Sequence, residues 1–288
     1  MADAREVPTT SLGDGVAMPM VGFGTWRLCG SRAYNAVRRA LDAGYRHIDT
    51  ASVYKNEAEV GRAVRDSGLD RREVFLTTKL PAGADIRDRA TIGDSLRALD
   101  TGYVDLLLIH WPPDGTASPA VWGDLLAIRD KGLARAVGVS NYSPHQIDEL
   151  TRATGETPAV DQVPWSPLRH NPALLAALRE RGVAIAGYSP LKDTDLRSLV
   201  LAEIAARHRV TPAQVVLRWL LEHEITGIPK SAHRHRIESN FALWGFSLMA
   251  DEVSRLDALA ATEAPRVSSG TLSRTRETGL TGRGRISP

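Results

Sequence analysis

The sequence predicts an α/β fold, namely a (β/α)8 TIM barrel that is preceded by an N-terminal β-hairpin and followed by a flexible C-terminal tail. Eight short apolar runs rich in β-branched residues alternate with stretches of helical periodicity, which is typical of repeated βα units around a parallel sheet. Eight strands fit a closed barrel better than an open doubly wound sheet. The open sheet would also carry a glycine fingerprint, but Arg27 stands where a third glycine should follow Gly22 and Gly24.

The expected elements follow one another from the N-terminus. Residues 11–19 contain the pair Asp14-Gly15 between apolar positions, which predicts a hairpin with a two-residue turn that would close the lower end of the barrel. The clearest helix begins at Ser31, which can cap the exposed amides, and ends at Gly44. The eight expected strands cover residues 20–24, 46–49, 74–79, 104–110, 135–139, 159–163, 183–188 and 225–229.

The pattern of strands and helices stops near Thr262. Residues 263–288 consist mainly of Ser, Thr, Gly and Arg, and they hold five Arg against two Glu. Such a composition favours a mobile polar tail. We therefore expect one barrel domain over residues 1–262 and an Arg-rich tail over residues 263–288.

Composition excludes several classes of function. The 36 basic and 34 acidic residues are mixed along the chain and give a net charge of +2, so no basic stripe for nucleic acid is expected. The longest apolar runs, such as residues 106–109, are far shorter than the roughly 20 residues that cross a bilayer. The single cysteine, Cys29, and a first segment without an apolar core predict a cytoplasmic protein.

Most of the expected strands end in a side chain that can donate, accept or stack. The carboxyl ends of barrel strands carry function in this fold, so these positions are candidates for a site. Any one of them could equally be an ordinary polar loop residue, but the set is harder to dismiss. The strand ends hold Thr25 and Trp26, Asp49, Lys79, His110, Ser140 and Asn141, Gln162, Tyr188, and Lys230.

Asp49, Tyr54, Lys79 and His110 together suit the protonation of a carbonyl oxygen. A phenol ionises near pH 10, and an adjacent ammonium lowers that pKa, so Lys79 would tune Tyr54 as a proton donor. Asp49 would keep a buried Lys79 charged, and His110 would donate a hydrogen bond to the substrate. Since the chain has only five lysines against 31 arginines, a lysine at a strand end indicates that an ammonium is required there.

These residues resemble the motifs of the aldo-keto reductases. The similarity extends from about residue 7 to residue 260. The motifs occur in the family's order: Asp49-Thr50-Ala51-Ser52-Val53-Tyr54-Lys55-Asn56-Glu57, Thr77-Thr78-Lys79-Leu80, Leu108-Ile109-His110-Trp111-Pro112, Gly138-Val139-Ser140-Asn141, Gln162, Tyr188-Ser189-Pro190-Leu191 and Ile228-Pro229-Lys230-Ser231.

The resemblance implies reduction of an aldehyde or ketone by hydride from NADPH, with Tyr54 as proton donor and Asp49, Lys79 and His110 in support. It also implies a nicotinamide site in which Ser140, Asn141 and Gln162 hold the carboxamide and Tyr188 stacks on the ring. Further cofactor contacts are implied for Thr25, Asp49, Ser189 and Leu191.

The segment after the last strand resembles the family's site for the adenosine phosphate. Lys230, Ser231 and Arg236 align there, and two cations around one anion favour a 2'-phosphate, hence NADPH over NADH. Asn240 would contact adenine. The sequence departs from the family at Ser239, where a glutamate is usual, and at Asp161, where many relatives have Asn.

The resemblance implies fewer residues on the substrate side of the site. Trp26, His110 and Trp111 hold family positions for substrate contact, and Trp165 is a further candidate for the pocket wall. We expect a small-molecule carbonyl substrate, no metal site and a monomer. Two alternatives stay open at this stage: a cofactor-binding regulatory subunit with little turnover, and a lyase that uses Lys79 to form a Schiff base.

Overall fold

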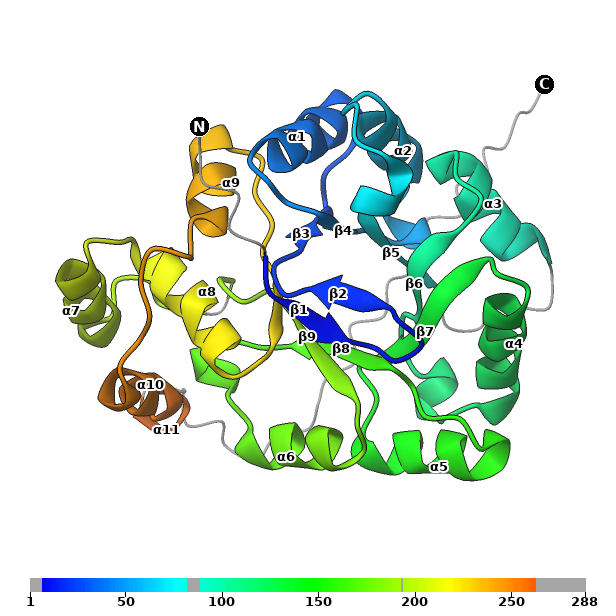
Figure 1. Cartoon of the computed structure of the whole chain (residues 1–288). Coiled ribbons are helices and arrows are strands. Elements are labelled where there is room, and N and C mark those ends of the chain that lie inside the picture. Colours follow the sequence, from blue (N-terminus) through cyan, green and yellow to red (C-terminus); the bar gives the residue numbers. More distant parts are fainter. Residues whose placement is uncertain (1–6, 82–88, 193, 263–288) are drawn as a thin grey trace, which may run out of the picture.

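The computed structural model describes residues 7–81, 89–192 and 194–262, and within them the chain forms a parallel eight-stranded barrel (Figure 1). The strand order is β10-β9-β8-β7-β6-β5-β4-β3, and a parallel bridge between Val21 and Gly227 brings the two edges together. The predicted fold is therefore confirmed. The strands are β3 (Phe23–Gly24), β4 (His47–Asp49), β5 (Phe75–Leu80), β6 (Val104–Ile109), β7 (Ala134–Ser140), β8 (Val160–Pro164), β9 (Ala184–Tyr188) and β10 (Thr226–Ile228).

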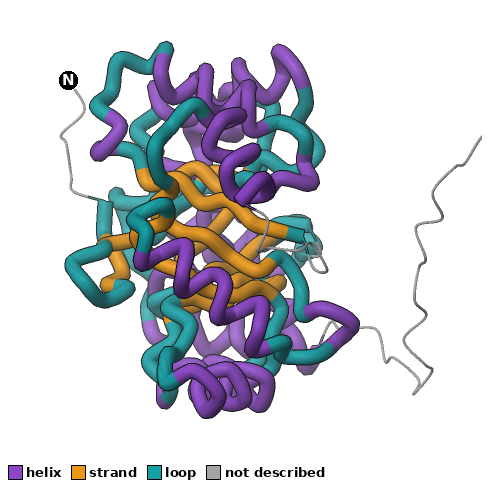
Figure 2. Tube along the Cα trace, turned by 90° about the vertical axis from the view of Figure 1, so that its right-hand side faces the viewer, coloured by secondary structure: helices purple, strands orange, loops and turns teal. Residues whose placement is uncertain are grey.

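Helices surround the strands, and Figure 2 shows them on both sides of the sheet seen from the side. One helix connects each pair of successive strands from β3 to β9, two connect β9 to β10, and three follow β10 in the described part of the chain. The helices are α1 (Gly30–Asp42), α2 (Glu57–Arg65), α3 (Arg89–Leu99), α4 (Pro119–Asp130), α5 (Pro144–Thr154), α6 (Pro172–Glu180), α7 (Leu199–His208), α8 (Pro212–Glu222), α9 (Arg234–Phe241), α10 (Ala250–Asp257) and α11 (Leu259–Thr262).

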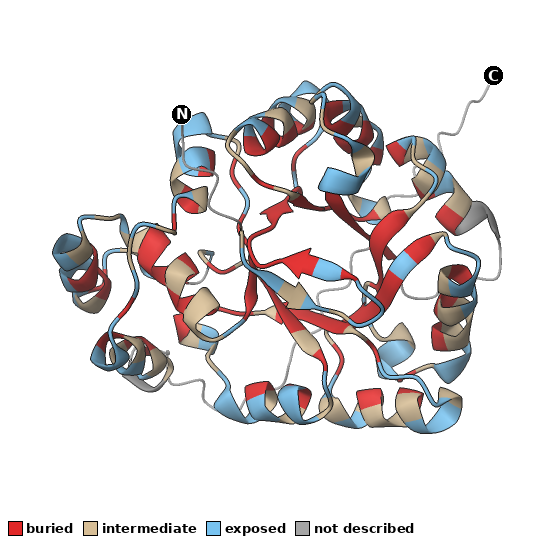
Figure 3. Cartoon of the chain, viewed as in Figure 1, coloured by how far each residue is buried: buried red, intermediate tan, exposed pale blue. Residues whose placement is uncertain are grey.

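The apolar residues form two cores, because successive side chains of a strand point to opposite faces. In β6, Leu106 and Leu108 belong to the cluster inside the barrel, whereas Leu107 and Ile109 pack in the layer between strands and helices. Both faces of this strand are buried, which explains its continuous apolar run (Figure 3). The barrel is thus a filled core and not a pore.

The N-terminal hairpin closes one end of the barrel, as predicted. Its strands β1 (Thr9–Ser11) and β2 (Ala17–Pro19) pair antiparallel and lie across the opening in Figure 1. Val16 and Met18 are buried among the residues that fill the barrel interior. The predicted two-residue turn is wrong, because three successive residues, Gly13, Asp14 and Gly15, all adopt positive φ at the tip.

The first helix differs from the prediction in its cap. α1 begins at Gly30 after Cys29, so Ser31 lies inside the first turn, and no side chain caps the helix. Its end is as expected, since Gly44 follows the C-cap with φ of +107°.

The predicted tail, residues 263–288, lies outside the described residues. Within the described ranges, no helix is both long and apolar enough to cross a bilayer.

We predict that Gly61→Ala destabilises the protein although alanine favours helices. Gly61 lies in α2, and a Cβ atom there would overlap the backbone carbonyl of Leu99 at the end of α3. The two helices would have to separate, at a cost of about 1 to 3 kcal/mol in the free energy of unfolding. Urea denaturation followed by circular dichroism measures this change.

Gly123→Ala in α4 is the matched control. No atom lies within 4 Å of a Cβ placed at Gly123, so alanine should stabilise the helix by about 0.5 to 1 kcal/mol. Equal effects of the two substitutions would contradict the close approach of α2 and α3.

Candidate active site

The predicted catalytic residues come together at the carboxyl ends of neighbouring strands. Asp49 is the last residue of β4, Lys79 lies near the end of β5, and His110 directly follows β6. Tyr54 ends the short 3-10 helix η1 (Ser52–Tyr54) after β4. Since β4 pairs with β5 and β5 with β6, the four side chains converge although 61 positions separate the first from the last in the sequence.

Lys79 is the centre of this group. Its side chain is only 1% exposed, and the ammonium donates to Asp49 Oδ1 at 2.6 Å and to the Thr50 carbonyl at 2.8 Å. Burial alone lowers the pKa of Lys79, but the charge of Asp49 and the contact with Tyr54 outweigh it and raise this pKa above its ordinary value. The ammonium therefore stays charged at neutral pH.

Tyr54 lies against this ammonium, whose nitrogen is 5.2 Å from the centre of the phenol ring. Burial raises the pKa of Tyr54, while the charge and hydrogen bond of Lys79 lower it. The effect of Lys79 has the predicted sign, but the prediction that the pKa of Tyr54 falls below its ordinary value is wrong, because the loss of solvent is the larger effect. The phenol consequently holds its proton at neutral pH.

His110 stands edge-on to Tyr54, with ring centres 5.7 Å apart and an interplanar angle of 72°. Burial, with the nearby Lys79 charge, lowers the pKa of His110 to about 4. The imidazole is therefore neutral at physiological pH, and it can donate one N–H to an oxygen without competing for the proton that Tyr54 holds.

The predicted nicotinamide residues join the same hydrogen-bond network. Gln162 Nε2 donates to Asp49 Oδ2 at 2.7 Å, and Ser140 Oγ donates to the Gln162 carbonyl at 2.7 Å. Asn141 Nδ2 donates to Ser140 Oγ at 2.9 Å, and Tyr188 Oη donates to Asn141 Oδ1 at 2.9 Å. A continuous chain of contacts thus leads from the ammonium to the ring of Tyr188.

Two buried residues that sequence reasoning missed hold this arrangement in place. Asn56 accepts from Thr50 Oγ1 at 2.7 Å and donates to the carbonyls of Thr25 and Leu28. Glu57 accepts from Thr78 Oγ1 at 2.6 Å, next to Lys79. Both belong to the motif that contains Tyr54, so their position in that motif was the available signal.

The remaining predicted cofactor residues near the strand ends have varied environments. Thr25 is fully buried, and its hydroxyl donates to the Asp49 carbonyl at 3.0 Å. Ser189 directly follows β9 and has a positive φ of +55°. Leu191 packs against the apolar core and is half-buried.

The predicted phosphate-binding residues lie after β10 and in the first turn of α9. Lys230 and Arg236 are exposed, and among the described residues neither pairs with a carboxylate, although many arginines of this chain do. No side chain caps the start of α9, and its first turn holds no acidic residue. Two available cations beside uncapped helix amides are a donor set that fits a phosphate group.

Comparison with known proteins agrees with this geometry. The sequence model of the Aldo/keto reductase family matches residues 20–261. The chain is 40% identical over 256 residues to a 9,11-endoperoxide prostaglandin H2 reductase of Trypanosoma cruzi, covering 86% of this chain and 90% of that enzyme. It is 40% identical over 269 residues to a 2,5-diketo-D-gluconic acid reductase B of Corynebacterium sp., covering 92% and 96%.

The chain belongs to the aldo/keto reductase family. A crystal structure of a Bombyx mori aldo-keto reductase in complex with NADP superimposes with a TM-score of 0.82 at 32% identity, covering 88% of this chain and 93% of that one. The protein is accordingly an NADP-dependent oxidoreductase that acts on carbonyl groups.

The tryptophans of this aldo/keto reductase divide into two groups. Trp26, after β3, and Trp111, after the predicted catalytic residue His110, are 41% and 51% exposed at the carboxyl ends of the strands. Trp165, in contrast, is 1% exposed and packs edge-on against His170 in the core. Of the two possibilities for Trp165, pocket wall or core packing, the structure shows core packing, since its ring does not reach the surface.

The two departures from the family pattern have structural consequences. Glu238, one residue before Ser239, is exposed and bound to Arg234 at 2.7 Å, so it does not replace the usual glutamate. Asp161 is completely buried, and no described residue forms a hydrogen bond with its Oδ2 atom. Burial raises the pKa of Asp161 well above its ordinary value although backbone amides of Tyr142 and Asn141 lower it. Burial therefore favours the protonated, neutral form of Asp161, the residue before Gln162.

We predict that Asp161→Asn stabilises this reductase increasingly as pH rises. A carboxyl whose pKa is raised by folding favours the native state fully below its unfolded pKa and loses that advantage as pH rises towards the native value. The amide keeps the acceptor oxygen and cannot ionise. The gain should be near zero at about pH 4 and about 1 to 2 kcal/mol at about pH 8, measured by urea denaturation.

Asp105→Asn is the control, because Asp105 is also buried but accepts from Arg71 at 2.8 Å and Arg135 at 3.0 Å. Loss of the Asp105 charge should destabilise the protein by roughly 2 kcal/mol. This is less than the cost of breaking a fully buried ion pair, because both arginines reach solvent. If the difference in the free energy of unfolding between Asp161→Asn and the parent did not change with pH, the raised pKa of Asp161 would be contradicted.

Proposed function

We propose that this aldo/keto reductase reduces small aldehydes and ketones with hydride from NADPH and that Tyr54 donates the proton. The observation that carries the proposal is the contact of one buried ammonium, Lys79, with both Asp49 and Tyr54 beside a neutral His110. Each group has the protonation state that carbonyl reduction requires of it.

The proposed roles follow from these contacts. NADPH, when bound, supplies the hydride. The imidazole N–H of His110 orients the substrate carbonyl oxygen towards the phenol, and the Tyr54 hydroxyl transfers its proton to that oxygen. Lys79 then stabilises the phenolate that remains, and Asp49 keeps the ammonium charged and oriented.

The chain's other predicted residues position the two reactants. We propose that Ser140, Asn141 and Gln162, which hydrogen bonds join to one another, hold the carboxamide, and that Tyr188, whose hydroxyl is bound to Asn141, stacks on the nicotinamide. We propose that Trp26 and Trp111 flank the substrate, since both are exposed beside the catalytic residues. Two tryptophans favour an apolar or planar substrate end.

The Schiff-base alternative is disfavoured by the state of Lys79. A nucleophilic lysine must lose its proton, but Asp49 and Tyr54 raise the pKa of this one. Borohydride added with a carbonyl substrate should therefore trap no adduct.

The regulatory-subunit alternative is disfavoured because all four catalytic residues are in contact.

We further propose that the protein is a cytoplasmic monomer of one barrel domain, with residues 263–288 as a tail, and that it binds neither nucleic acid nor membranes. The mixed distribution of its 36 basic and 34 acidic residues and a single free cysteine, Cys29, support this proposal.

We predict that Tyr54→Phe lowers kcat for carbonyl reduction by about 100-fold to 10,000-fold while NADPH affinity stays nearly constant. The substitution removes only the proton donor and leaves the ring in contact with Lys79 and His110. Loss of NADPH absorbance across aldehydes, ketones and α-dicarbonyls measures turnover, and quenching of tryptophan fluorescence measures cofactor binding.

Tyr34→Phe controls for the loss of a phenolic hydroxyl, since Tyr34 donates to Asp66 on the surface. It should leave turnover unchanged. If Tyr54→Phe kept most of the activity, the proton donor would be another group. If the parent bound NADPH but turned over no carbonyl compound in the panel, the regulatory-subunit alternative would replace the proposal.

Lys230→Met and Arg236→Met should each weaken NADPH binding by about 10-fold to 100-fold and leave NADH binding nearly unchanged. Each removes one charged hydrogen bond, worth about 1.5 to 3 kcal/mol, to a 2'-phosphate that NADH lacks. Arg234→Met in the same helix is the control, because Arg234 is already bound to Glu238. Equal losses for the two cofactors would disprove 2'-phosphate recognition by these residues.

A further inference from the structure

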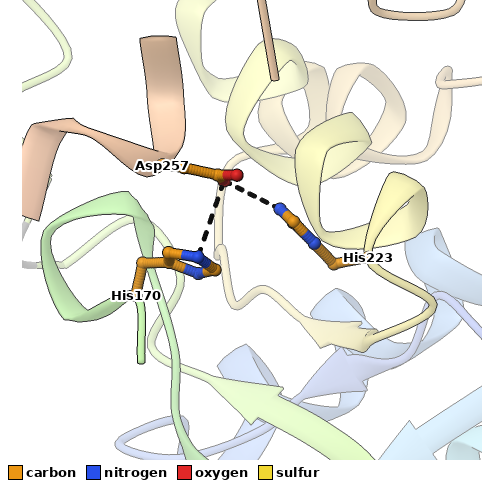
Figure 4. Close-up of side chains that lie close together, drawn as sticks. All are labelled: His170, His223 and Asp257. Carbon is orange, nitrogen blue, oxygen red and sulfur yellow. Dashed lines mark hydrogen bonds and ion pairs between the residues drawn. The ribbon is translucent and has the colours of Figure 1, made fainter. Parts of the chain in front are cut away.

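A second group of ligating side chains lies outside the carbonyl site. His170 precedes α6, His223 follows α8, and Asp257 is the last residue of α10 (Figure 4). One ligand atom from each residue lies within 4.8 Å of the others. The three residues come from segments separated by more than thirty positions, so the tertiary fold alone brings them together.

The two imidazoles point at one carboxylate. His223 Nε2 lies 2.8 Å from Asp257 Oδ1, and His170 Nε2 lies 3.8 Å from the same oxygen. The two imidazole rings are 5.1 Å apart and tilted by 32°. Two histidines therefore share one acceptor, which binds one of them closely and leaves the other without a hydrogen bond at normal distance.

His170 is the residue that hydrogen bonding leaves unexplained. Its side chain is only 8% exposed, and within the described ranges its Nδ1 atom has no hydrogen-bond partner. A buried imidazole without a partner costs free energy unless another group compensates it. The other ring nitrogen, Nε2, is the one that faces the cluster, and it lies 3.8 Å from Asp257 Oδ1, which is too far for a hydrogen bond.

Asp257 is held in position by a neighbouring indole. Trp219 Nε1 donates to Asp257 Oδ1 at 2.7 Å, and the Trp219 ring also stands edge-on to both histidines. Metal-ligating carboxylates commonly receive such a second hydrogen bond, which fixes their orientation. The carboxylate is therefore oriented before any ligand binds.

We propose that His170, His223 and Asp257 bind a divalent transition-metal ion of the zinc type. Two imidazoles and one carboxylate form the donor set of zinc sites with three protein ligands, in which water completes the tetrahedron. Mg²⁺ and Ca²⁺ are excluded as preferred ions because they select oxygen ligands.

The required rearrangement is small. Ligand atoms about 2.05 Å from a tetrahedral zinc lie about 3.3 Å from one another. This value falls between the 2.8 Å and 3.8 Å that separate Asp257 Oδ1 from the two histidines. Each of these two distances would change by about half an ångström, and the ligand atoms of the two histidines lie within 4.8 Å of each other.

The consequence of binding is a cross-link between three segments of the chain. The ion would tie the end of helix α10 to the end of α8 and to the loop before α6. It would thus stabilise the packing of α10 and take no part in hydride transfer, which the proposed function assigns to other residues.

The test uses the full chain without an affinity tag, freed of metal with a chelator. Calorimetric titration with Zn²⁺ should give one equivalent bound with a micromolar or smaller Kd, and Co²⁺ should develop the visible absorption of a four-coordinate ion. His170→Gln and His223→Gln should each weaken Zn²⁺ binding by about 100-fold or more. His145→Gln, which removes an exposed histidine on α5, should not change it.

Asp257→Asn guards against loss of folding, because the amide oxygen still accepts from Trp219 and His223 but carries no charge. It should retain the parent's circular dichroism and still weaken Zn²⁺ binding. Absence of stoichiometric binding by the parent, or equal binding by the parent, His170→Gln and Asp257→Asn, would overturn the proposal and leave a hydrogen-bonded cluster only. Carbonyl reduction does not enter these readouts, so the proposal stands or fails independently of the proposed function.

Discussion

The buried ion pair between Lys79 and Asp49 is the constraint on which the rest of the site depends. Moving two charges out of water costs several kcal/mol each, and only close contact with further hydrogen bonds compensates that cost. Asp49 uses both oxygens, one for Lys79 at 2.6 Å and one for Gln162 at 2.7 Å. The residues predicted to bind cofactor are therefore also the residues that make the ion pair tolerable.

The barrel accommodates this charge because its inward side chains change from apolar to polar along the barrel axis. In β5 the inward side chains pass from Phe75, which packs in the apolar interior, through Thr77, which contacts His47 at 3.0 Å, to Lys79. Apolar residues and the hairpin fill the opposite end, where Met18 is fully buried. Stability and chemistry are thus located at different ends of the same strands, as the barrel fold permits.

The sequence was sufficient for the barrel and for the positions of the predicted catalytic residues because both leave local patterns. β5 and β6 are buried on both faces and appear as continuous apolar runs, and Lys79 and His110 stand where those runs end. Effects that depend on environment could not be predicted in this way. Three such effects depend on segments that are distant in the sequence and leave no local signal. They are the burial that raises the pKa of Tyr54, the burial of Trp165, and the proximity of His170 to Asp257.

The choice of lysine at position 79 follows from the number of its donors. An ammonium has three N–H groups, and here they meet the Asp49 carboxylate, the Thr50 carbonyl and the Tyr54 phenol. The planar guanidinium of arginine has five donors in a fixed fork, so in this buried space at least two would lack an acceptor. In the proposed mechanism, a compact charge would also remain close to the phenol oxygen as that oxygen loses its proton. The presence of a lysine at position 79, in a chain with only five lysines, therefore reflects a requirement of the site.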